Sequence, residues 1–441
     1  MANPMLIKEV TEDRLSLLLK RNMEINPKVP NVETKDIFQK ICTSKEDLNM
    51  TDDIPAEEIS KWIEPRTALE KCRPLLSNYE RHEILSFPKI FFIGSSKMKN
   101  SKISGDFPFG NFGFDDMENY YMAIPHDHIG YRYEILKVLG KGSFGQVLKV
   151  YDHKTGEFAA LKIIRNDKRF LYQAKREVKI LEHLLREDAS NTANVVHIKN
   201  NFIFRSHMCI VFELMSLNLY ELVKKNKFRG MKVAVVRKFA YSIAIALSLV
   251  HRKQIIHGDL KPENVLLKKY GMTGIKLVDF GSSCYTDGKL MTYVQSRFYR
   301  APEVILECGY DTAVDIWSFG CLVAELVLGQ PLLPGQDEDD QLALMIEMLG
   351  PPPASLLARS RDRGSRFISC TTGQPRYLMR RGIASRGAPG SRDIEQVLGP
   401  FIKQEQDSLV IDFIRRCLHW DPALRLTADQ ALGHPWLASL F

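Results

Sequence analysis

The stretch HGDLKPEN at residues 257–264, with DFG following at residues 279–281, decides the fold of this chain. Its polar residues are of the types that phosphoryl transfer uses, because that reaction depends on positioning and charge neutralisation more than on covalent chemistry. Asp259 can accept the hydrogen bond of a substrate hydroxyl and orient it. Lys261 can lie beside the transferred phosphoryl group and stabilise its charge. We therefore predict that Asp259 and Lys261 are catalytic residues.

Two more side chains of the same stretch are candidate metal ligands. Asn264 and Asp279 lie fifteen residues apart and offer hard oxygen ligands. Mg²⁺ prefers a few such ligands from the protein together with phosphate oxygens. We therefore predict ATP and Mg²⁺ as cofactors. An Ala-Pro-Glu triplet follows at residues 301–303, and Arg425 is a candidate buried partner for Glu303.

A glycine-rich loop, GKGSFGQV at residues 140–147, precedes this stretch and separates two apolar segments typical of strands. Glycine lets the backbone approach phosphates closely and adopt the φ values of a tight turn. The loop opens no helix, which argues against a dinucleotide-binding motif of the Rossmann type, and it lacks the ending of a Walker loop. The residues predicted to contact the nucleotide here are Leu139, Gly140, Lys141, Gly142, Ser143, Phe144, Gly145 and Val147.

Lys162 stands in the apolar segment AALKII and is the next candidate nucleotide contact. A lysine flanked by apolar residues is partly desolvated and needs an anionic partner. Glu177, in the helix that follows, is the partner we predict, and the ion pair would hold the ammonium against the α- and β-phosphates. The alternative is that both are surface charges without a common role.

The order of strand-like and helical segments predicts an α+β fold with two lobes and a cleft between them. Strands are predicted over residues 134–139, 147–152 and 158–164, and one helix near residues 173–186. The rest of the chain is mainly helical, as in residues 236–251.

The segment before the glycine-rich loop carries weaker signals. Short helices are predicted at residues 11–19 and 36–42. Ser77 is a candidate N-cap, with Glu80 three residues later to complete a capping box. The apolar run at residues 90–93 is typical of a strand.

Taken in order, these motifs resemble the signature set of protein kinases. Within that superfamily the chain resembles the class II dual-specificity tyrosine-regulated kinases, the DYRK family of the CMGC group, over residues 66–436. The resemblance is closest in HDHIGYRYEILKVLGKGSFGQV, HGDLKPENVLL, DFGSSCY, YVQSRFYRAPEVIL and PLLPGQDEDDQL. HDHIGYRYE is similar to the DH box that precedes the kinase domain in that family, and the residues upstream resemble its accessory autophosphorylation region.

The resemblance implies a bilobal protein kinase fold with a strand-rich N-lobe and a helical C-lobe. The predicted divisions are an N-terminal extension at 1–65, an accessory region with the DH box at 66–132, and a kinase domain at 133–437. Within the kinase domain we predict an N-lobe at 133–212, a C-lobe at 216–437 and an arginine-rich insertion at about 354–392.

The resemblance also implies the reaction. The chain would transfer the γ-phosphate of ATP to Ser and Thr of protein substrates that carry arginine before the target and proline after it, with Glu263 as acceptor for the arginine. It would phosphorylate its own Tyr293, whose phosphate Arg297 and Arg300 would bind; without that phosphate, we expect the two arginines to lack an anion. At the adenine pocket the resemblance implies a gatekeeper and a hinge, namely Phe212 followed by Glu213, Leu214 and Met215.

Three features depart from the family pattern and keep a pseudokinase scaffold open as the alternative function. Gly258 stands where the family usually has cysteine, and the backbone freedom of glycine would loosen Asp259, so we expect reduced activity. Met291 replaces a first loop tyrosine, and the insertion and N-terminus are divergent. The scaffold is disfavoured because Lys162, Asp259 and the two metal ligands are present.

The net charge of +8 is concentrated in one segment. Residues 359–392 hold nine arginines and one acid. Such a block is usually a solvated insertion, and the alternative is contact with nucleic acid or an acidic partner. We favour the first, since no series of stacking aromatic residues accompanies the arginines.

No signal peptide is apparent, and the longest apolar stretch, near residues 239–250, is shorter than a membrane span. We therefore predict a soluble, cytoplasmic protein, with a nuclear share left open. We expect a monomer whose partners are protein substrates rather than a membrane or nucleic acid.

Overall fold

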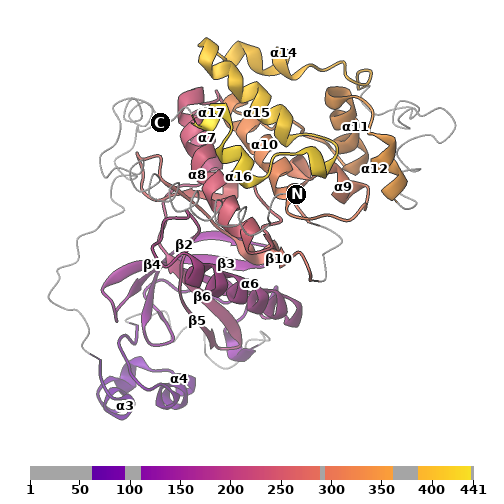
Figure 1. Ribbon diagram of the computed structural model, residues 1–441. Helices are drawn as coiled ribbons and strands as arrows, with labels where there is room; N and C mark the ends of the chain where they lie inside the picture. The colour runs from indigo at the N-terminus through magenta and orange to yellow at the C-terminus, as the bar shows by residue number, and fades with distance from the viewer. Residues whose placement is uncertain (1–61, 95–110, 289–293, 361–385, 439–441) are drawn as a thin grey trace, which may run out of the picture. The chain divides into compact units, whose positions relative to one another are not determined.

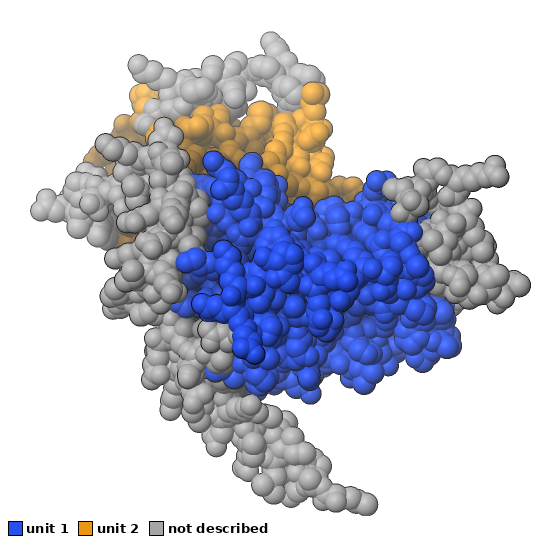
Figure 2. Space-filling view, turned by 90° about the horizontal axis from the view of Figure 1, so that it is seen from above, with its two compact units in different colours: residues 1–43, 186–195, 216–441 blue, residues 44–185, 196–215 orange. Residues whose placement is uncertain are grey.

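The computed structural model describes four stretches of the chain, at residues 62–94, 111–288, 294–360 and 386–438. These form two compact units, coloured separately in Figure 2. We call them the sheet unit (residues 62–94, 111–185 and 196–215) and the helical unit (the remaining described residues). The helices predicted at residues 11–19 and 36–42 lie outside the described residues.

The sheet unit is built on a six-stranded antiparallel sheet in the order β1-β2-β3-β4-β6-β5. Its inward face carries alternate apolar residues such as Leu148, Val150, Leu161 and Ile163, all nearly inaccessible to solvent. The strands are β1 (His128–Ile129), β2 (Tyr133–Gly142), β3 (Gly145–Asp152), β4 (Glu157–Ile164), β5 (Ile198–Phe204) and β6 (His207–Glu213). The strands predicted at residues 134–139, 147–152 and 158–164 are therefore confirmed as β2, β3 and β4.

One long helix, α6 (Lys168–Glu187), belongs with this sheet and begins five residues earlier than predicted. The reason is Asp167, whose carbonyl accepts the N–H of Leu171 and whose carboxylate accepts the N–H of Arg169. Asp is a favoured residue just before a helix, because it satisfies N–H groups that have no partner within the helix.

The accessory region contributes helices α3 (Pro65–Cys72) and α4 (Asn78–Glu83) to the same unit. The predicted capping box is confirmed, with Ser77 Oγ accepting the Glu80 N–H at 3.2 Å and a Glu80 oxygen accepting the Ser77 N–H at 2.9 Å. The helices close over a small apolar core of Ala68, Leu76, Ile84, Ile90 and Tyr131.

The strand predicted at residues 90–93 is wrong. Ile90 forms an isolated bridge with Ile63, and no strand is assigned over residues 90–93 in the described part of the chain. Phe91 and Phe92 both donate their N–H groups to the single carbonyl of Tyr131, so a ladder cannot continue.

The helical unit contains two long, largely buried helices, α8 (Val233–Arg252) and α10 (Ala313–Leu328), which pack against each other and are labelled in Figure 1. By length and composition α8 could cross a membrane, yet 83% of its apolar window is buried within the structure, as in the core helix of a globular domain. The other helices are α7 (Leu219–Lys225), α9 (Pro302–Ile305), α11 (Glu338–Leu349), α12 (Ala354–Arg359), α14 (Ile394–Leu398), α15 (Leu409–Cys417), α16 (Ala428–Leu432) and α17 (Pro435–Ala438).

Two short antiparallel strand pairs in the helical unit flank the loops that contain Asp259, Asn264 and Asp279. The pairs are β7 (Ile255–Ile256) with β10 (Cys284–Tyr285), and β8 (Val265–Leu267) with β9 (Ile275–Leu277). A strand-rich unit followed by a mainly helical one confirms the predicted α+β class.

The arginine-rich insertion is more structured at its ends than predicted. It opens with helix α12, and Arg386 at its other end binds Asp340 with two hydrogen bonds of 2.7 Å. Gly390 and Arg392 donate their N–H groups to carbonyls of α11. Residues 386–392 are therefore held to α11 by hydrogen bonds, yet each of them keeps part of its surface exposed, in keeping with the expected solvated segment. Residues 361–385 lie outside the described residues.

Candidate active site

Asp259 lies in the loop between β7 and β8, and its carboxylate is held from three directions. One oxygen accepts the N–H and the hydroxyl of Ser296, at 3.1 and 2.8 Å. The other accepts Lys261 Nζ at 2.8 Å and Asn264 Nδ2 at 3.2 Å. Lys261 Nζ also donates to Ser296 Oγ at 2.9 Å. The structure thus brings the two predicted catalytic residues together in one hydrogen-bonded group.

Ser296 is a functional residue that the sequence analysis missed. It is 37 residues from Asp259 in the chain, yet it contacts both Asp259 and Lys261. The only sequence signal is a hydroxyl residue five positions before Ala301 of the Ala-Pro-Glu triplet. Because its hydroxyl touches both charged groups, Ser296 fixes their separation.

The loop that carries Asp259 is anchored by Asp315 of α10, which the sequence analysis also missed. Asp315 is fully buried and accepts the N–H groups of His257 and Gly258 at 2.8 and 2.9 Å. His251 lies 3.0 Å from the same carboxylate. Burial works against the charged form, but the contact with His251 and the backbone N–H groups hold the Asp315 pKa below its usual value.

Gly258, the residue before Asp259, has a backbone conformation that favours glycine. Its backbone has φ +77°, a left-handed conformation that glycine adopts without strain, and a Cβ there would lie 2.9 Å from the Ser282 carbonyl oxygen. Its N–H is held by Asp315, and its carbonyl accepts the N–H of Gln295 at 2.9 Å. Glycine therefore suits this backbone conformation, and both of its backbone groups are hydrogen-bonded. The expected loss of activity from Gly258 stays a prediction.

We expect Gly258→Ala to lower the free energy of unfolding by about 1–2 kcal/mol, because it combines a left-handed backbone with a close contact. Gly271→Ala is the matched control, since Gly271 has φ +81° but a Cβ there would meet nothing within 4 Å. Chemical denaturation of both variants measures the difference. Equal losses would show that the Ser282 contact is without effect.

The predicted metal ligands Asn264 and Asp279 are neighbours through the backbone. Val278, next to Asp279, donates its N–H to the Asn264 carbonyl at 3.0 Å. Asn264 Nδ2 donates to the backbone oxygen and carboxylate of Asp259, which leaves its amide oxygen as the atom able to bind a cation. This donor set, one amide oxygen and one carboxylate, fits Mg²⁺ bound together with phosphates.

In the sheet unit, Lys162 on β4 and Glu177 on α6 form the predicted ion pair. Lys162 Nζ lies 2.8 and 3.0 Å from the two Glu177 oxygens. The side chains are 14% and 2% exposed, so the alternative of two separate surface charges is wrong.

The glycine-rich loop is the turn between β2 and β3, as predicted. A Cβ on Gly145 would lie 2.2 Å from the Ile163 carbonyl oxygen, so only glycine fits there. At Gly140 and Gly142 a Cβ would meet nothing within 4 Å, which leaves the backbone open to a ligand. Phe212 and Glu213 end strand β6, and Leu214 and Met215 follow it.

Comparison with known proteins assigns the family. A family model described as protein kinase domain matches residues 133–437. The chain is 50% identical over 392 residues to dual specificity tyrosine-phosphorylation-regulated kinase 3 of Rattus norvegicus, covering 85% of this chain and 65% of the relative. It is 47% identical over 392 residues to kinase 4 of the same series from Homo sapiens, covering 88% of this chain and 74% of the relative.

The chain belongs to the dual-specificity tyrosine-phosphorylation-regulated kinases. The mbk-2 kinase of Caenorhabditis elegans is a further relative, 46% identical over 429 residues. This member of the family spans 65% of the length of its rat relative and 51% of the nematode one.

In this kinase, Arg300 has partners that the sequence analysis did not foresee. The side chain is 1% exposed and donates to the Val294 and Gln295 carbonyls and to the Glu338 carboxylate at 2.9 Å. The expectation that Arg300 lacks an anion without phosphotyrosine is therefore wrong, because Glu338 of α11 supplies one. Tyr293 lies outside the described residues.

Arg297 is held differently. Its Nη1 donates to the carbonyls of Gly335 and Gln336, and its buried Nε has no hydrogen-bond partner among the described residues. No carboxylate is among the acceptors described for it. Arg297 therefore keeps donor capacity for an anion, and its role as a phosphate-binding residue stays a prediction.

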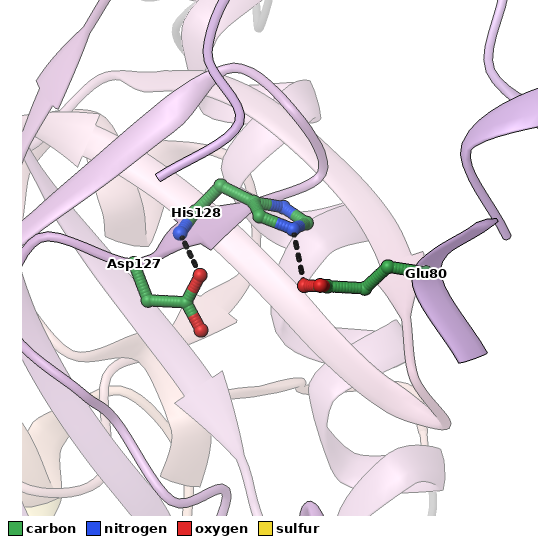
Figure 3. A group of neighbouring side chains, drawn as sticks. All are labelled: Glu80, Asp127 and His128. Carbon is green, nitrogen blue, oxygen red and sulfur yellow. Dashed lines mark hydrogen bonds and ion pairs between the residues drawn. The ribbon is translucent and has the colours of Figure 1, made fainter. Parts of the chain in front are cut away.

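Outside this site, Glu80, Asp127 and His128 form a buried group in the sheet unit with the composition of a metal centre (Figure 3). The hydrogen bonds argue against a metal. His128 Nε2 lies 3.0 Å from Glu80, its Nδ1 accepts the Tyr131 N–H, and the Arg205 guanidinium lies 3.2 Å from the same Glu80 oxygen. With both ring nitrogens engaged and a cation already present, the group is an internal ion network that joins the accessory region to the sheet.

Proposed function

We propose that this chain transfers the γ-phosphate of ATP to serine and threonine hydroxyls of proteins and phosphorylates its own Tyr293. The observation that carries the proposal is the Asp259 carboxylate, fixed by Ser296, Lys261 and Asn264 in one hydrogen-bonded group. A carboxylate held in this way is positioned to accept a proton from a hydroxyl nucleophile, with a lysine beside it to balance developing charge.

The other residues position the reactants. Mg²⁺ with ATP supplies the activated phosphoryl group and neutralises its charge. Asn264 and Asp279 are the residues that would hold the ion, and Lys162, fixed by Glu177, would bind the α- and β-phosphates. The glycine-rich loop offers its backbone to the same phosphates.

We infer a preference for proline after the target residue from the backbone of Gln295. This residue has φ +66°, and its carbonyl accepts Arg300 Nη2 at 2.8 Å. A substrate amide that would otherwise bind this carbonyl finds it occupied, which costs about 1 kcal/mol or more for an unpaired N–H. Proline lacks that N–H and loses nothing.

We infer a preference for arginine before the target from a pair of acids. Glu263, adjacent to the catalytic loop, has a buried carboxylate oxygen without a hydrogen-bond partner among the described residues. Burial, and to a smaller extent the Glu263 charge, raise the pKa of Glu325 on α10 to about 7, against the hydrogen bond that Tyr299 donates to it at 2.6 Å. Two neighbouring acids with no cation described beside them favour a guanidinium from a ligand.

This pair predicts a pH-dependent preference. As pH rises through 7, Glu325 loses its proton and adds a negative charge, so we expect the kcat/KM ratio of an arginine peptide over its alanine counterpart to rise roughly fivefold from pH 6 to pH 8. Peptide kinetics at both pH values measure the ratio. In Glu325→Gln the rise should disappear, and its persistence would show that another group titrates.

Phosphorylation of Tyr293 would place an anion with two ionised oxygens near residues 294–300. Arg297 supports this proposal because its buried Nε has no partner among the described residues. Arg300 would contribute only by exchanging or sharing Glu338.

The experiment that tests the proposed function is incubation of the purified chain with Mg-ATP and an arginine-directed, proline-following peptide, followed by mass spectrometry of both. We expect phosphate on the peptide hydroxyl and on Tyr293. A peptide without phosphate, equally with wild type and with Asp259→Asn, would leave the scaffold alternative.

A further inference from the structure

A small β-hairpin lies just before the kinase domain, at residues 114–122, and we call it the Tyr120 hairpin. Its arms are joined by backbone bonds from Met122 N to Phe114 O at 2.8 Å and from Asp116 N to Tyr120 O at 2.9 Å. At its tip Asp116 accepts the N–H groups of Glu118 and Tyr120, both at 2.9 Å. Desolvation works against the charged form of Asp116, but these two N–H groups and the nearby Lys141 together hold its pKa below the usual value. Hydrogen bonds within the hairpin therefore hold its turn in one conformation.

The base of the hairpin is anchored in the sheet unit. Asp115 is 1% exposed and bonded to His207 of β6 at 2.7 Å, to Asn166 at 2.8 Å and to Asn111 at 2.9 Å. A buried carboxylate with three partners is costly to disturb. The hairpin therefore has a defined position relative to the strands.

The tip of the hairpin contacts the glycine-rich loop directly. Tyr120 donates its hydroxyl to the Gly142 carbonyl at 2.8 Å. Lys141 Nζ lies 3.8 Å from the centre of the Tyr120 ring and 3.3 Å from an Asp116 oxygen. Gln146 donates its amide to the Tyr121 carbonyl at 2.5 Å. Both the first half of the loop and its return strand are tied to the hairpin.

The side chain of Lys141 contacts the hairpin, with its ammonium next to Asp116 and over the Tyr120 ring. The predicted contact of Lys141 with the nucleotide stays a prediction, which its backbone could still make. A cation over an aromatic face and next to a carboxylate is stabilised by both.

Arg165 contacts both the Tyr120 hairpin and the glycine-rich loop. Its guanidinium lies 4.7 Å from the centre of the Tyr120 ring and donates to the carbonyls of Glu118 at 2.9 Å and Ser143 at 3.2 Å. Its backbone N–H donates to the Phe144 carbonyl at 3.0 Å. One residue thus joins the hairpin to the tip of the glycine-rich loop.

We propose that the Tyr120 hairpin is a positioning element for ATP, which holds the glycine-rich loop in its nucleotide-binding conformation from outside the kinase domain. A loop with three glycines has high backbone entropy when free, and ordering it on ligand binding costs affinity. The hairpin removes part of that cost before the nucleotide arrives. This inference rests on the proposed function in one respect, namely that the glycine-rich loop binds ATP.

Tyr120→Phe is the direct test, because it deletes the hydrogen bond to Gly142 and keeps the ring that contacts Lys141 and Arg165. Calorimetry with a non-hydrolysable ATP analogue should show Kd raised about fivefold, the effect of one lost hydrogen bond. KM for ATP should rise by a similar factor while KM for the peptide stays unchanged. Amide hydrogen exchange at residues 141–146 should become faster.

Tyr172→Phe is the matched control, since Tyr172 lies on α6 with 75% of its surface exposed. It should leave Kd and exchange as in wild type. Unchanged Kd and unchanged exchange in Tyr120→Phe would overturn the proposal, and so would a rise in Kd that Tyr172→Phe reproduces. Analogue binding that is absent in wild type would instead count against the proposed function itself.

Discussion

Asp259→Asn is expected to lower kcat by about 10³-fold, the scale of losing a positioned proton acceptor. The amide keeps the size of the carboxylate and can still accept the Ser296 hydrogen bonds, but it loses the charge that Lys261 and the substrate hydroxyl require. Steady-state kinetics with a peptide substrate measure the loss.

Two further measurements make this result specific. The thermal midpoint and the affinity for an ATP analogue should stay close to wild type, because the Lys162–Glu177 pair in the sheet unit is untouched. Ser296→Ala should lower kcat less, by about tenfold, since it removes one neutral contact to each charged group. Asp259→Asn with more than a tenth of wild-type kcat would remove Asp259 from the chemistry.

Arg425→Met is expected to destabilise the helical unit by about 3–5 kcal/mol, the usual cost of breaking a buried ion pair. Arg425 binds Glu303 with two hydrogen bonds, at 2.5 and 2.7 Å, and the two side chains are 0% and 1% exposed. Its guanidinium also donates to the backbone carbonyls of His419 and Trp420. Methionine fills similar volume but leaves the Glu303 carboxylate buried without a cation.

Urea denaturation of Arg425→Met and of the double variant Glu303→Gln/Arg425→Met separates the cost of the uncompensated Glu303 charge from the cost of losing the other contacts of Arg425. The double variant should recover part of the lost stability, because no uncompensated charge remains. A double variant as unstable as the sum of the two single ones would mean that the pair does not interact energetically. Arg416→Met is a suitable control, since its pair with Asp412 lies on the surface and should contribute less than about 1 kcal/mol.

Sequence patterns over a few residues predict local structure correctly where the residues involved are close together in the chain. The capping box at Ser77 and Glu80 depends on residues three apart, and the β2–β3 turn depends on glycines within one loop. Lys162 and Glu177 were also predictable, because a strand passing directly into a helix brings them together, and a lysine in an apolar strand must find an acid.

The structure differs from the sequence-based predictions where a residue far away in the chain supplies a hydrogen-bond or ion-pair partner. The apolar run at 90–93 has strand composition, but Tyr131 takes the N–H groups that a ladder needs. Arg300 was expected to lack an anion until a phosphate arrives, but Glu338, 38 residues away, already binds it. At Gly258 the sequence shows a flexible residue, and only the structure shows that its φ value is left-handed, a conformation that glycine adopts without strain.

Residue identity and spacing along the chain show which chemical groups are available: an aspartate and a lysine proposed for transfer, oxygen ligands proposed for a cation, and glycines proposed for close approach to phosphates. Their identities and spacing follow from what phosphoryl transfer demands. The tertiary structure alone decided which groups act together, as with Ser296 on Asp259 and Tyr120 on Gly142. Such contacts join segments far apart in the chain, and their energy depends on burial and direction, which no local pattern encodes.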